Sequence, residues 1–491
     1  MPLNQCWLKT GSGPTTVKWV DTKKRSRLVG RDFKPKGEEE RGDIFASMPP
    51  WEAKKFLFSK AASQKGRSRK RKLIFIDATK AHVNGKCEVD AFIDLPEEIQ
   101  EAGKCAKLNF WLYGMRPAAR AWEDTYSNKL VEYGFVQGVS APTVFFHKEK
   151  NMECVVHGDD FTILGFEEDL DDLALAMGSW FEIKVRGKIG PEVGDNKEMT
   201  ILNRTITWEE WGIKIVADPK HAERLIDFFG LEENSSTVVS IGKKDTDDKL
   251  EDDEEKDESE VLGGREQTIY RGLAATLNYL AQDRYDIQFG GKELCREMAV
   301  PTTASMAKMK RAARYLLGIP VLEIWFVEQC MLDSVSIYVD SDWAGCLVTR
   351  KSTSGGVVMH GKHCIKTWAS TQATRATSSA EAEFYAIVEG ASRGLGIKSL
   401  VADMGSKVQI VMYSDASAGR SLAFRNGLGK VRHIETKFLW VQDLVRDGRI
   451  RLLKVLGKRN PADIGTKHLS ILEMQGKLQE MGLKVMPRKK R

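Results

Sequence analysis

Two apolar runs with a short polar break between them stand out in the N-terminal half of the chain. The runs at residues 154–156 and 161–164 flank a glycine, which predicts the two strands of a hairpin. The break places Asp159 and Asp160 side by side at the tip. Adjacent carboxylates repel each other, and hard cations such as Mg²⁺ prefer carboxylate oxygens, so a metal site is one interpretation. An ordinary turn is the other, because Gly and Asp favour turns.

A buried strand is predicted upstream, where the four apolar residues 73–76 end in Asp77. Carboxylates at strand ends can meet side by side in a sheet, so we expect Asp77 and Asp159 to lie close enough to share two Mg²⁺ ions. A two-metal site of this kind activates a hydroxyl and stabilises the leaving oxygen of a phosphate. For Asp77 taken alone, a strand-end cap is the alternative.

The C-terminal half begins with helices and continues with strands. Leucine and isoleucine recur at the spacing of amphipathic helices between residues 261 and 318. A long helix is predicted after Ser378 and Ser379, with Gly405 as its end. Strands alternating with helices predict an α/β layer architecture. The strands are predicted at three β-rich runs, residues 335–339, 356–359 and 410–413.

Acidic residues stand at the ends of these strands and at the start of the long helix. Asp340 and Asp415 each end a strand, and Glu381 and Glu383 lie in the first helical turn. Helix capping is one interpretation of either glutamate. Glu383, however, lies on a mostly apolar face of the predicted helix, where a carboxylate is costly unless it is paired or metal-bound. Asp463 follows a later strand, with a turn cap as its alternative.

Composition narrows the class of protein. A chain of 491 residues allows roughly two to four domains, and hydrophobic and charged fractions of 42% and 29% are typical of globular proteins. No apolar run is long enough to span a bilayer. The eight cysteines include no CxxC pair, which predicts reduced thiols in an intracellular compartment and disfavours a structural zinc site.

Charge is distributed unevenly along the chain. The net charge is +6, although residues 245–260 carry eleven Asp and Glu against two Lys, which predicts a flexible acidic linker. The remainder is strongly basic and includes the runs 65–72 and 488–491, so a polyanionic partner is favoured. Either run alone is typical of a solvated loop or tail.

Four blocks of the N-terminal half resemble Ty1/copia-type retrotransposon reverse transcriptases. Residues 25–33, 76–85, 107–122 and 157–160 are similar, in order, to the family segments KARLVAKGF, LDVKNAFLNG, LYGLKQAPRAW and YVDD. The resemblance implies that Asp77, Asp159 and Asp160 are catalytic, metal-binding carboxylates of a polymerase palm. It also places Arg25 and Arg27 in the fingers, near the incoming nucleoside triphosphate.

Four of the differences from the family bear on its chemistry. His157 and Gly158 replace a tyrosine and an aliphatic residue before the aspartate pair, and Pro117 replaces a glutamine. His82 stands at the nucleotide-binding position where the family has an aromatic residue that discriminates against a ribose 2′-OH. These differences favour an alternative: a catalytically inactive or nuclease-only nucleic-acid-binding relic of a copia-type element.

Blocks of the C-terminal half resemble the copia-type ribonuclease H domain. The resemblance implies four catalytic, metal-binding acids, Asp340, Glu383, Asp415 and Asp463. Glu383 is preferred to Glu381 because it heads the Glu-x-x-Ala element that this fold shares. The blocks are residues 340–345, 350–355, 378–386, 414–418, 432–435 and 462–464.

Two further residues near these acids have open roles. Asp342 is a weaker alternative to Asp340 as the first acid. His433 could assist proton transfer or product release, while a structural role is the alternative and the more common one.

The resemblance covers residues 17–470 and implies a fragment of a Pol polyprotein, an RNA-directed DNA polymerase with ribonuclease H activity. It implies two Mg²⁺ ions per site, with Mn²⁺ as a substitute. The implied partners are an RNA template, a DNA primer, an RNA–DNA hybrid and deoxynucleoside triphosphates, with no membrane. The implied location is intracellular and cytoplasmic, in element-encoded particles, with access to the nucleus. The oligomeric state stays open.

The implied fold is a multidomain α+β and α/β protein. A right-hand polymerase with palm, fingers and thumb precedes a ribonuclease H-like mixed sheet with flanking helices. The expected segments are an N-terminal tail (1–16), an N-terminally truncated reverse transcriptase (17–240), an acidic linker (241–262), a helical connection (263–330), a ribonuclease H-like domain (331–470) and a basic C-terminal tail (471–491).

Overall fold

The computed structural model describes residues 1–491 except 23–25, 36, 40, 243–258, 430 and 489–491. Arg25 and most of the predicted acidic linker therefore lie outside the described residues. The chain divides into two compact units. Unit 1 comprises Met1–Leu57, Lys70–Gly190 and Leu400–Ser406, and unit 2 comprises Phe58–Arg69, Pro191–Ser399 and Lys407–Arg491.

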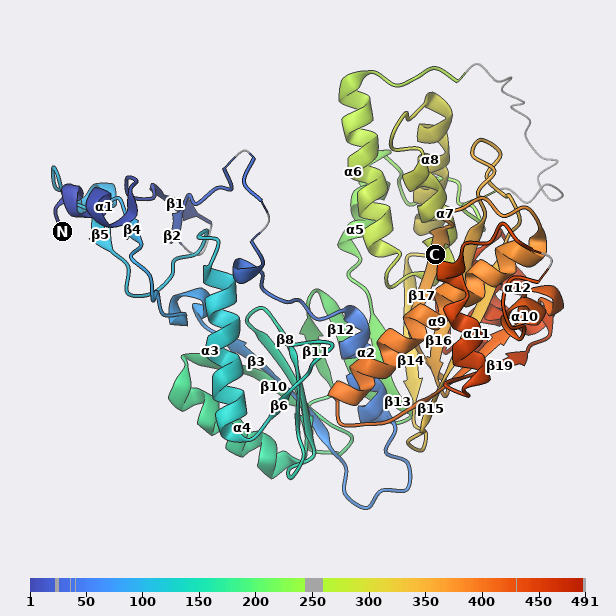
Figure 1. Ribbon diagram of the computed structural model, residues 1–491, viewed down its shortest axis with the longest axis horizontal. Helices are drawn as coiled ribbons and strands as arrows, with labels where there is room; N and C mark the ends of the chain where they lie inside the picture. Colours follow the sequence, from blue (N-terminus) through green and yellow to red (C-terminus); the bar gives the residue numbers. More distant parts are fainter. Residues whose placement is uncertain (23–25, 36, 40, 243–258, 430, 489–491) are drawn as a thin grey trace. The chain divides into compact units, whose positions relative to one another are not determined.

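Unit 1 is built around an antiparallel six-stranded sheet of order β10-β3-β9-β8-β7-β6 (Figure 1). Its strands are β3 (Lys72–Ala78), β6 (Val136–Gln137), β7 (Val144–His147), β8 (Met152–His157), β9 (Asp160–Gly165) and β10 (Ile183–Ile189). Two two-stranded sheets pair β1 (Val17–Asp21) with β2 (Ser26–Gly30) and β4 (Phe92–Ile93) with β5 (Ala106–Lys107). The helices are α1 (Leu3–Thr10), α3 (Ala118–Tyr133), α4 (Glu167–Trp180) and the first part of α2 (Trp51–Ala62), and short 3₁₀ turns lie at Gly42–Ile44, Ala81–Asn84 and Glu97–Ile99.

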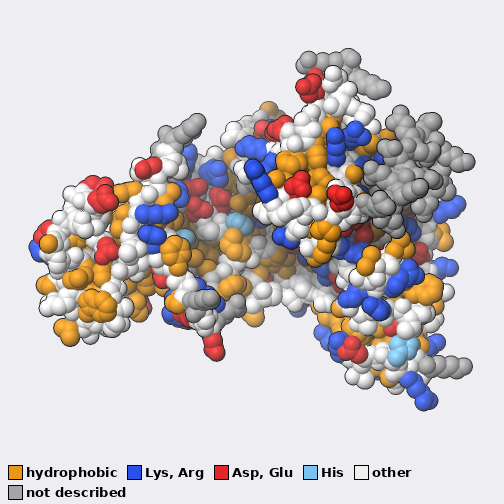
Figure 2. Space-filling model, turned by 90° about the horizontal axis from the view of Figure 1, so that it is seen from above, with side chains coloured by type: hydrophobic (Ala, Val, Ile, Leu, Met, Phe, Trp, Pro, Cys, Tyr) orange, Lys and Arg blue, Asp and Glu red, His pale blue; other side chains and the backbone are white. Residues whose placement is uncertain are grey.

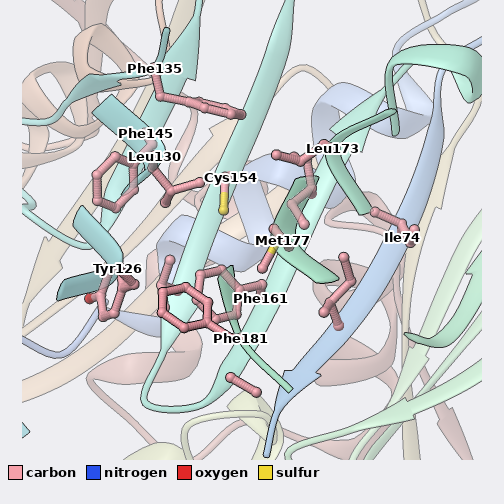
Figure 3. Close-up of a cluster of buried hydrophobic side chains, with 14 of the residues drawn as sticks. Ile74, Tyr126, Leu130, Phe135, Phe145, Cys154, Phe161, Leu173, Met177 and Phe181 are labelled. Atoms are coloured by element: carbon pink, nitrogen blue, oxygen red, sulfur yellow. The ribbon is translucent and has the colours of Figure 1, made fainter. Parts of the chain in front are cut away.

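Helices α3 and α4 supply the apolar side chains that cover one face of this sheet (Figure 3). Every second residue of a strand points to the same face, so Ile74 and Ile76 of β3 join Cys154 and Val156 of β8 in one buried cluster. The helices meet them at helical spacing, with Trp122, Tyr126 and Leu130 from α3 and Leu170, Leu173 and Met177 from α4.

The predicted hairpin and the predicted upstream strand are confirmed. Strands β8 and β9 are joined by a two-residue turn, and Gly158 adopts φ +66° there, a conformation that glycine reaches without strain. Asp160 pairs with His157 across the hairpin and with Asp77 on β3. Backbone register alone therefore brings two of the predicted carboxylates onto neighbouring strands.

Unit 2 contains two five-stranded sheets, of order β11-β12-β13-β14-β20 and β17-β16-β15-β18-β19. The strands are β11 (Glu198–Ile201), β12 (Arg204–Glu209), β13 (Gly212–Val216), β14 (Val321–Val327), β15 (Ser334–Ser341), β16 (Thr353–His360), β17 (His363–Thr371), β18 (Gln409–Ser414), β19 (Ile450–Lys454) and β20 (Leu483–Met486). The helices are α5 (Lys220–Phe228), α6 (Gly264–Leu280), α7 (Tyr285–Arg296), α8 (Thr303–Gly318), α9 (Ser379–Asp403), α10 (Ser417–Ala423), α11 (Trp440–Arg446) and α12 (Ile471–Glu480), with 3₁₀ turns η4 (Thr436–Phe438), η5 (Gly457–Arg459) and η6 (Pro461–Gly465).

The second sheet of unit 2 is mixed, since β15 is antiparallel to β16 and parallel to β18, and β18 is parallel to β19. Helix α9 packs closely on β15. A Cβ added at Gly390 would lie 2.4 Å from Val339, and one at Gly394 would lie 2.2 Å from Ile337. The predicted mixed α/β class, with helices flanking a mixed sheet, is confirmed.

The structure differs from the expected segments at both ends and near residue 190. The expected basic tail contains α12 and β20, because Met474 and Leu478 are buried and β20 pairs with β14. The expected N-terminal tail contains α1, which buries Cys6. Residues 191–240 group with unit 2. Within the described part of the chain, no helix is both long and apolar enough to cross a membrane.

Replacing Leu173 by Ala should destabilise unit 1, because Leu173 is fully buried between α4 and the sheet. A Leu→Ala change of this kind costs about 2–5 kcal/mol. Hydrogen exchange of the β8 and β9 amides should become correspondingly faster. Leu175→Ala on the same helix is the matched control, since Leu175 is 76% exposed and its loss should leave exchange unchanged. Equal effects of the two variants would contradict this account of the core.

Candidate active sites

The first carboxylate site lies at the end of β3 and at the tip of the β8–β9 hairpin. Asp77 is half-buried near the end of β3, opposite Asp160, and Asp159 is exposed in the turn. The Ala78 backbone N–H donates to the Asp159 carbonyl at 2.9 Å, and the Trp122 indole N–H donates to the Gly158 carbonyl at 2.9 Å. The tip is therefore held to β3 on one side and to α3 on the other.

Asp77 and Asp159 line a cavity of about 550 Å³ whose other charged residues are basic. Partial desolvation at the cavity wall, together with the charges of Asp160 and Asp77, raises the pKa of Asp159. A cation or a cation-bound phosphate in the cavity would relieve this repulsion. The remaining lining residues are Ser26, Arg27, Ala78, Thr79, Lys80, Tyr113, Lys184 and Arg186.

Arg186 is a residue of this site that the sequence did not indicate. Its guanidinium donates to Asp160 Oδ1 at 2.9 Å. Strand β10 shifts register between Val185 and Gly187, and Lys184 lies opposite Asp77. The basic side chains of β10 reach the site only through this pairing with β3, which a sequence pattern does not reveal.

His82 belongs to a stack of side chains beside the first site. Its ring stacks on Tyr113 with centroids 4.6 Å apart, and the Arg27 guanidinium lies over the Tyr113 ring at 5.2 Å. Desolvation lowers the pKa of His82, which keeps the imidazole neutral near pH 7. Arg27 and His82, both predicted to bind nucleotide, are therefore brought together through Tyr113.

The second carboxylate site gathers Asp340 of β15, Glu383 of α9 and Asp415, which follows β18. One carboxylate oxygen from each lies within 4.8 Å of the others, and among the described residues this is the cluster that could hold a metal ion. Burial, with a contribution from the negative charges of neighbouring acids, raises the pKa of Asp340 to about 7 and that of Glu383 to about 8. The site therefore favours protons or a cation.

Close backbone approaches build this second site. Asp340 lies opposite Gly355 on β16, and a Cβ at Gly355 would lie 2.8 Å from the Ala462 carbonyl of η6. The η6 turn can therefore reach Asp340, whose carboxylate accepts a hydrogen bond from Thr466. On the other side, a Cβ at Gly419 would lie 2.7 Å from the Cβ of Glu383, so α10 also packs tightly there.

Asp463, the fourth predicted acid, lies beside this cluster but not in it. Its Oδ1 lies 2.6 Å from Lys467 Nζ, and its Oδ2 lies 2.9 Å from Lys477 Nζ. Asp463 still adds to the negative field at Asp340. The structure thus brings three of the four predicted acids together and pairs the fourth with lysines.

The alternative residues for the second site have other partners. Glu381 is buried and accepts hydrogen bonds from Thr377 and Tyr385, with His433 Nε2 at 2.9 Å. Asp342 accepts a hydrogen bond from the Thr353 backbone N–H at 2.5 Å. His433 is therefore held to Glu381 rather than to an acid of the cluster.

The residues of the second site fit a divalent cation. Glu383 Oε2 is buried and has no hydrogen-bond partner in the described part of the chain, and three carboxylates converge on the same point. Hard cations prefer such oxygen ligands. In the first site, Asp77 and Asp159 face the cavity, while Asp160 is engaged by Arg186.

Comparison with known proteins shows which proteins the chain is similar to. Residues 4–238 match the reverse transcriptase (RNA-dependent DNA polymerase) family. The Pol polyprotein of transposon TNT 1-94 from Nicotiana tabacum is 24% identical over 488 residues, covering 94% of this chain and 35% of that protein. The Pol polyprotein of transposon RE1 from Arabidopsis thaliana is 24% identical over 490 residues, covering 96% and 32%.

The chain is similar over most of its length to the Pol polyproteins of Ty1/copia-type retrotransposons. The resemblance found in the sequence is confirmed. The chain spans about a third of the length of these curated relatives. A solved structure of the foamy viral protease–reverse transcriptase dRH in complex with double-stranded DNA aligns with a TM-score of 0.48 at 10% identity, covering 91% of this chain and 66% of that one.

The raised pKa values of Asp340 and Glu383 predict how stability depends on pH without metal. Both acids hold their protons more tightly in the folded chain, so the stabilisation present below about pH 4 is lost as the pH rises through 7 and 8. In EDTA, Glu383→Gln should therefore melt at a higher temperature than the parent at pH 8.5. The expected difference is at least roughly 2–4 °C, the effect of 1 kcal/mol in a domain of 150–250 residues.

The same comparison at pH 5.5 is the control, because Glu383 is then protonated and resembles Gln. Added Mg²⁺ should raise the melting temperature of the parent at pH 8.5 more than that of Glu383→Gln. Parallel pH profiles for the two proteins would contradict a repulsive carboxylate cluster.

Proposed function

We propose that the chain is an RNA-directed DNA polymerase with ribonuclease H activity. It copies retrotransposon RNA into DNA and degrades the RNA strand of the resulting hybrid. The observation that carries the proposal is the reverse transcriptase family match over residues 4–238, which contain Asp77 and Asp159 on a cavity with basic walls. The relatives named as transposon Pol polyproteins support a retrotransposon origin.

In the polymerase site, Asp77 and Asp159 are the carboxylates that face the incoming nucleotide. Arg27, Lys184 and Arg186 line the same cavity and supply the positive charge that a triphosphate needs. Asp160 orients Arg186 through their 2.9 Å ion pair. The primer 3′-hydroxyl would attack the α-phosphate of the nucleotide, forming the new phosphodiester bond and releasing pyrophosphate.

In the nuclease site, Asp340, Glu383 and Asp415 face the scissile phosphate of the RNA strand. When bound in pairs at either site, Mg²⁺ (or Mn²⁺) activates the attacking oxygen and stabilises the leaving oxygen. The protein's own part is to hold the three carboxylates together through the packing of α9 on β15. Sparing DNA requires recognition of the 2′-OH, so we expect contacts in the minor groove of the hybrid.

The partners of this activity are nucleic acids and nucleotides: an RNA template, a DNA primer, an RNA–DNA hybrid and deoxynucleoside triphosphates. Lys and Arg side chains occur over much of the face drawn in Figure 2, which supports phosphate binding. Binding should therefore weaken steeply with salt. We place the activity in the cytoplasm, within element-encoded particles, with access to the nucleus.

A nuclease-only protein is the second candidate. Two observations favour it: the Asp160 carboxylate is engaged by Arg186, and the described carboxylates that gather as a metal cluster are Asp340, Glu383 and Asp415. If the nuclease activity were lost as well, the chain would be a catalytically inactive nucleic-acid-binding relic.

One pair of assays separates these candidates. Primer extension on an RNA template and cleavage of an RNA–DNA hybrid are measured with Mg²⁺ in the parent, Asp159→Asn and Asp415→Asn. We expect Asp159→Asn to abolish extension and spare cleavage, and Asp415→Asn to do the reverse. Losses of at least about 10²-fold are expected for residues that stabilise charge in the transition state.

Each outcome decides between the candidates. No extension by the parent chain, with cleavage retained, would leave the nuclease-only protein. Cleavage that survives Asp415→Asn would remove the assigned nuclease site. Salt-dependent hybrid binding with neither activity would leave the relic.

His82 should set the choice between ribose and deoxyribose in the polymerase reaction. Its ring stacks flat on Tyr113 beside Asp159, and an imidazole blocks a 2′-OH less fully than a phenyl ring. His82→Phe should therefore raise the preference for deoxynucleotides over ribonucleotides by roughly 10-fold, the value of about 1.4 kcal/mol. The measurement is kcat/KM for both nucleotides. His147→Phe, a histidine in the apolar surroundings of Phe135, is the control and should leave the ratio unchanged.

A further inference from the structure

Arg186 lines the cavity of the first site but is held by an acid from outside its lining. The guanidinium shares the wall of the 550 Å³ cavity with the basic side chains of Arg27, Lys80 and Lys184. Its ion-pair partner at 2.9 Å is Asp160, which is not among the described residues that line the cavity. An anion inside the cavity and the Asp160 carboxylate would therefore compete for the same guanidinium.

A β-bulge puts Arg186 in this position. Strand β10 pairs Val185 with Ile76 and Gly187 with Phe75, so Arg186 is the extra residue between two consecutive pairs. A bulge re-aims the side chain of its unpaired residue, and bulges are over-represented next to active sites. The place of Arg186 is therefore set by the backbone of β10 and not by the reach of a flexible side chain alone.

The ion pair between Arg186 and Asp160 can exchange partners. The two side chains are 37% and 18% exposed, so solvent screens their attraction. A phosphate group offers a guanidinium two oxygens in the same fork as a carboxylate does. A polyphosphate also carries more negative charge than one carboxylate. We therefore expect a phosphate in the cavity to displace Asp160 from Arg186.

The charge of the cavity favours such an anion. Among the described lining residues, four basic side chains stand against two carboxylates, those of Asp77 and Asp159. An excess of positive charge in a cleft raises the local concentration of anions. Asp160 reduces this excess by neutralising Arg186 when no anion is bound. The pair thus sets how tightly the cavity holds a phosphate.

We propose that Arg186 binds the pyrophosphate that the polymerase reaction releases, and that Asp160 is a positioning residue that competes with pyrophosphate for Arg186. This inference rests on the proposed polymerase function and deepens it. By reclaiming the guanidinium, Asp160 lowers the affinity for the product and speeds its release. Asp160 then acts on the leaving group, whereas the resemblance to the family implies a metal-binding role.

The test measures binding of inorganic pyrophosphate to the full chain by titration calorimetry in metal-free buffer, so that it depends on neither metal nor catalysis. The parent should bind, and more weakly as salt rises. Arg186→Leu should weaken the affinity by at least roughly tenfold, the value of one charge-assisted contact. Arg186→Lys should lie between the two, because it keeps the charge and loses the fork.

Asp160→Asn should have the opposite effect, because it frees the guanidinium. We expect a gain in affinity of roughly two- to fivefold, the value of a partly exposed ion pair. In the Arg186→Leu background the same change should have little effect, because Asp160 acts through Arg186. A structural role of Asp160 would not produce this dependence. Asn is nearly isosteric with Asp, so this variant stays informative if Arg186→Leu fails to fold.

Lys188→Met is the matched control. It removes one positive charge from the same strand, but Lys188 pairs with Glu167 and Asp171 at 2.9 Å each. Its affinity for pyrophosphate should equal that of the parent. Equal losses in Lys188→Met and Arg186→Leu would show an effect of net charge alone and would overturn the inference.

Three further results would overturn it: no binding by the parent, weaker binding by Asp160→Asn, or the same gain from Asp160→Asn with and without Arg186. Absence of primer extension with the expected binding pattern intact would instead contradict the proposed polymerase function. The assignment of Arg186 and Asp160 to a pyrophosphate site would then remain.

Discussion

Repulsion between like charges that the backbone forces together is the constraint on which both sites depend. In unit 1, the pairing of β3 with β9 sets Asp77 opposite Asp160. In unit 2, the glycine face of α9 brings Glu383 down to Asp340. A sheet cannot relax this repulsion by moving one side chain, because register fixes the strands and close packing fixes the helix. Each site therefore needs a source of positive charge.

The two units meet this need differently. In unit 1 an arginine from the neighbouring strand is already in place, since Arg186 engages Asp160 and leaves the other two carboxylates to the cavity. In unit 2 two lysines engage Asp463, whereas Asp340 and Glu383 of the three-acid cluster have raised pKa values. The difference follows from topology: β10 presents basic side chains beside β3, whereas in unit 2 Lys467 follows η6 and Lys477 lies in α12.

The parts that could be predicted from the sequence are those that depend on local pattern. The β8–β9 hairpin follows from two apolar runs around a glycine, and the α9 helix from its serine start and its glycine end. The contributions of Arg186 and Lys477 could not be predicted, because one depends on a register shift in β10 and the other on a helix inside a basic segment. The pair Asp463–Lys467 had a local signal, the i,i+4 spacing, that could have revealed it.

The same geometry explains how Gly158 and His157, which differ from the family's residues, fit into the first site. Gly158 has φ +66° in a two-residue turn, so the residue that replaces the family's aliphatic one suits a tight tip and holds Asp159 outward. Its carbonyl is in turn fixed by Trp122. His157 lies in register with Asp160 rather than with Asp159, so the replaced tyrosine position is beside the aspartate that Arg186 already engages. The change at His157 therefore lies beside the aspartate that Arg186 engages, and the change at Gly158 suits the tight turn that carries Asp159.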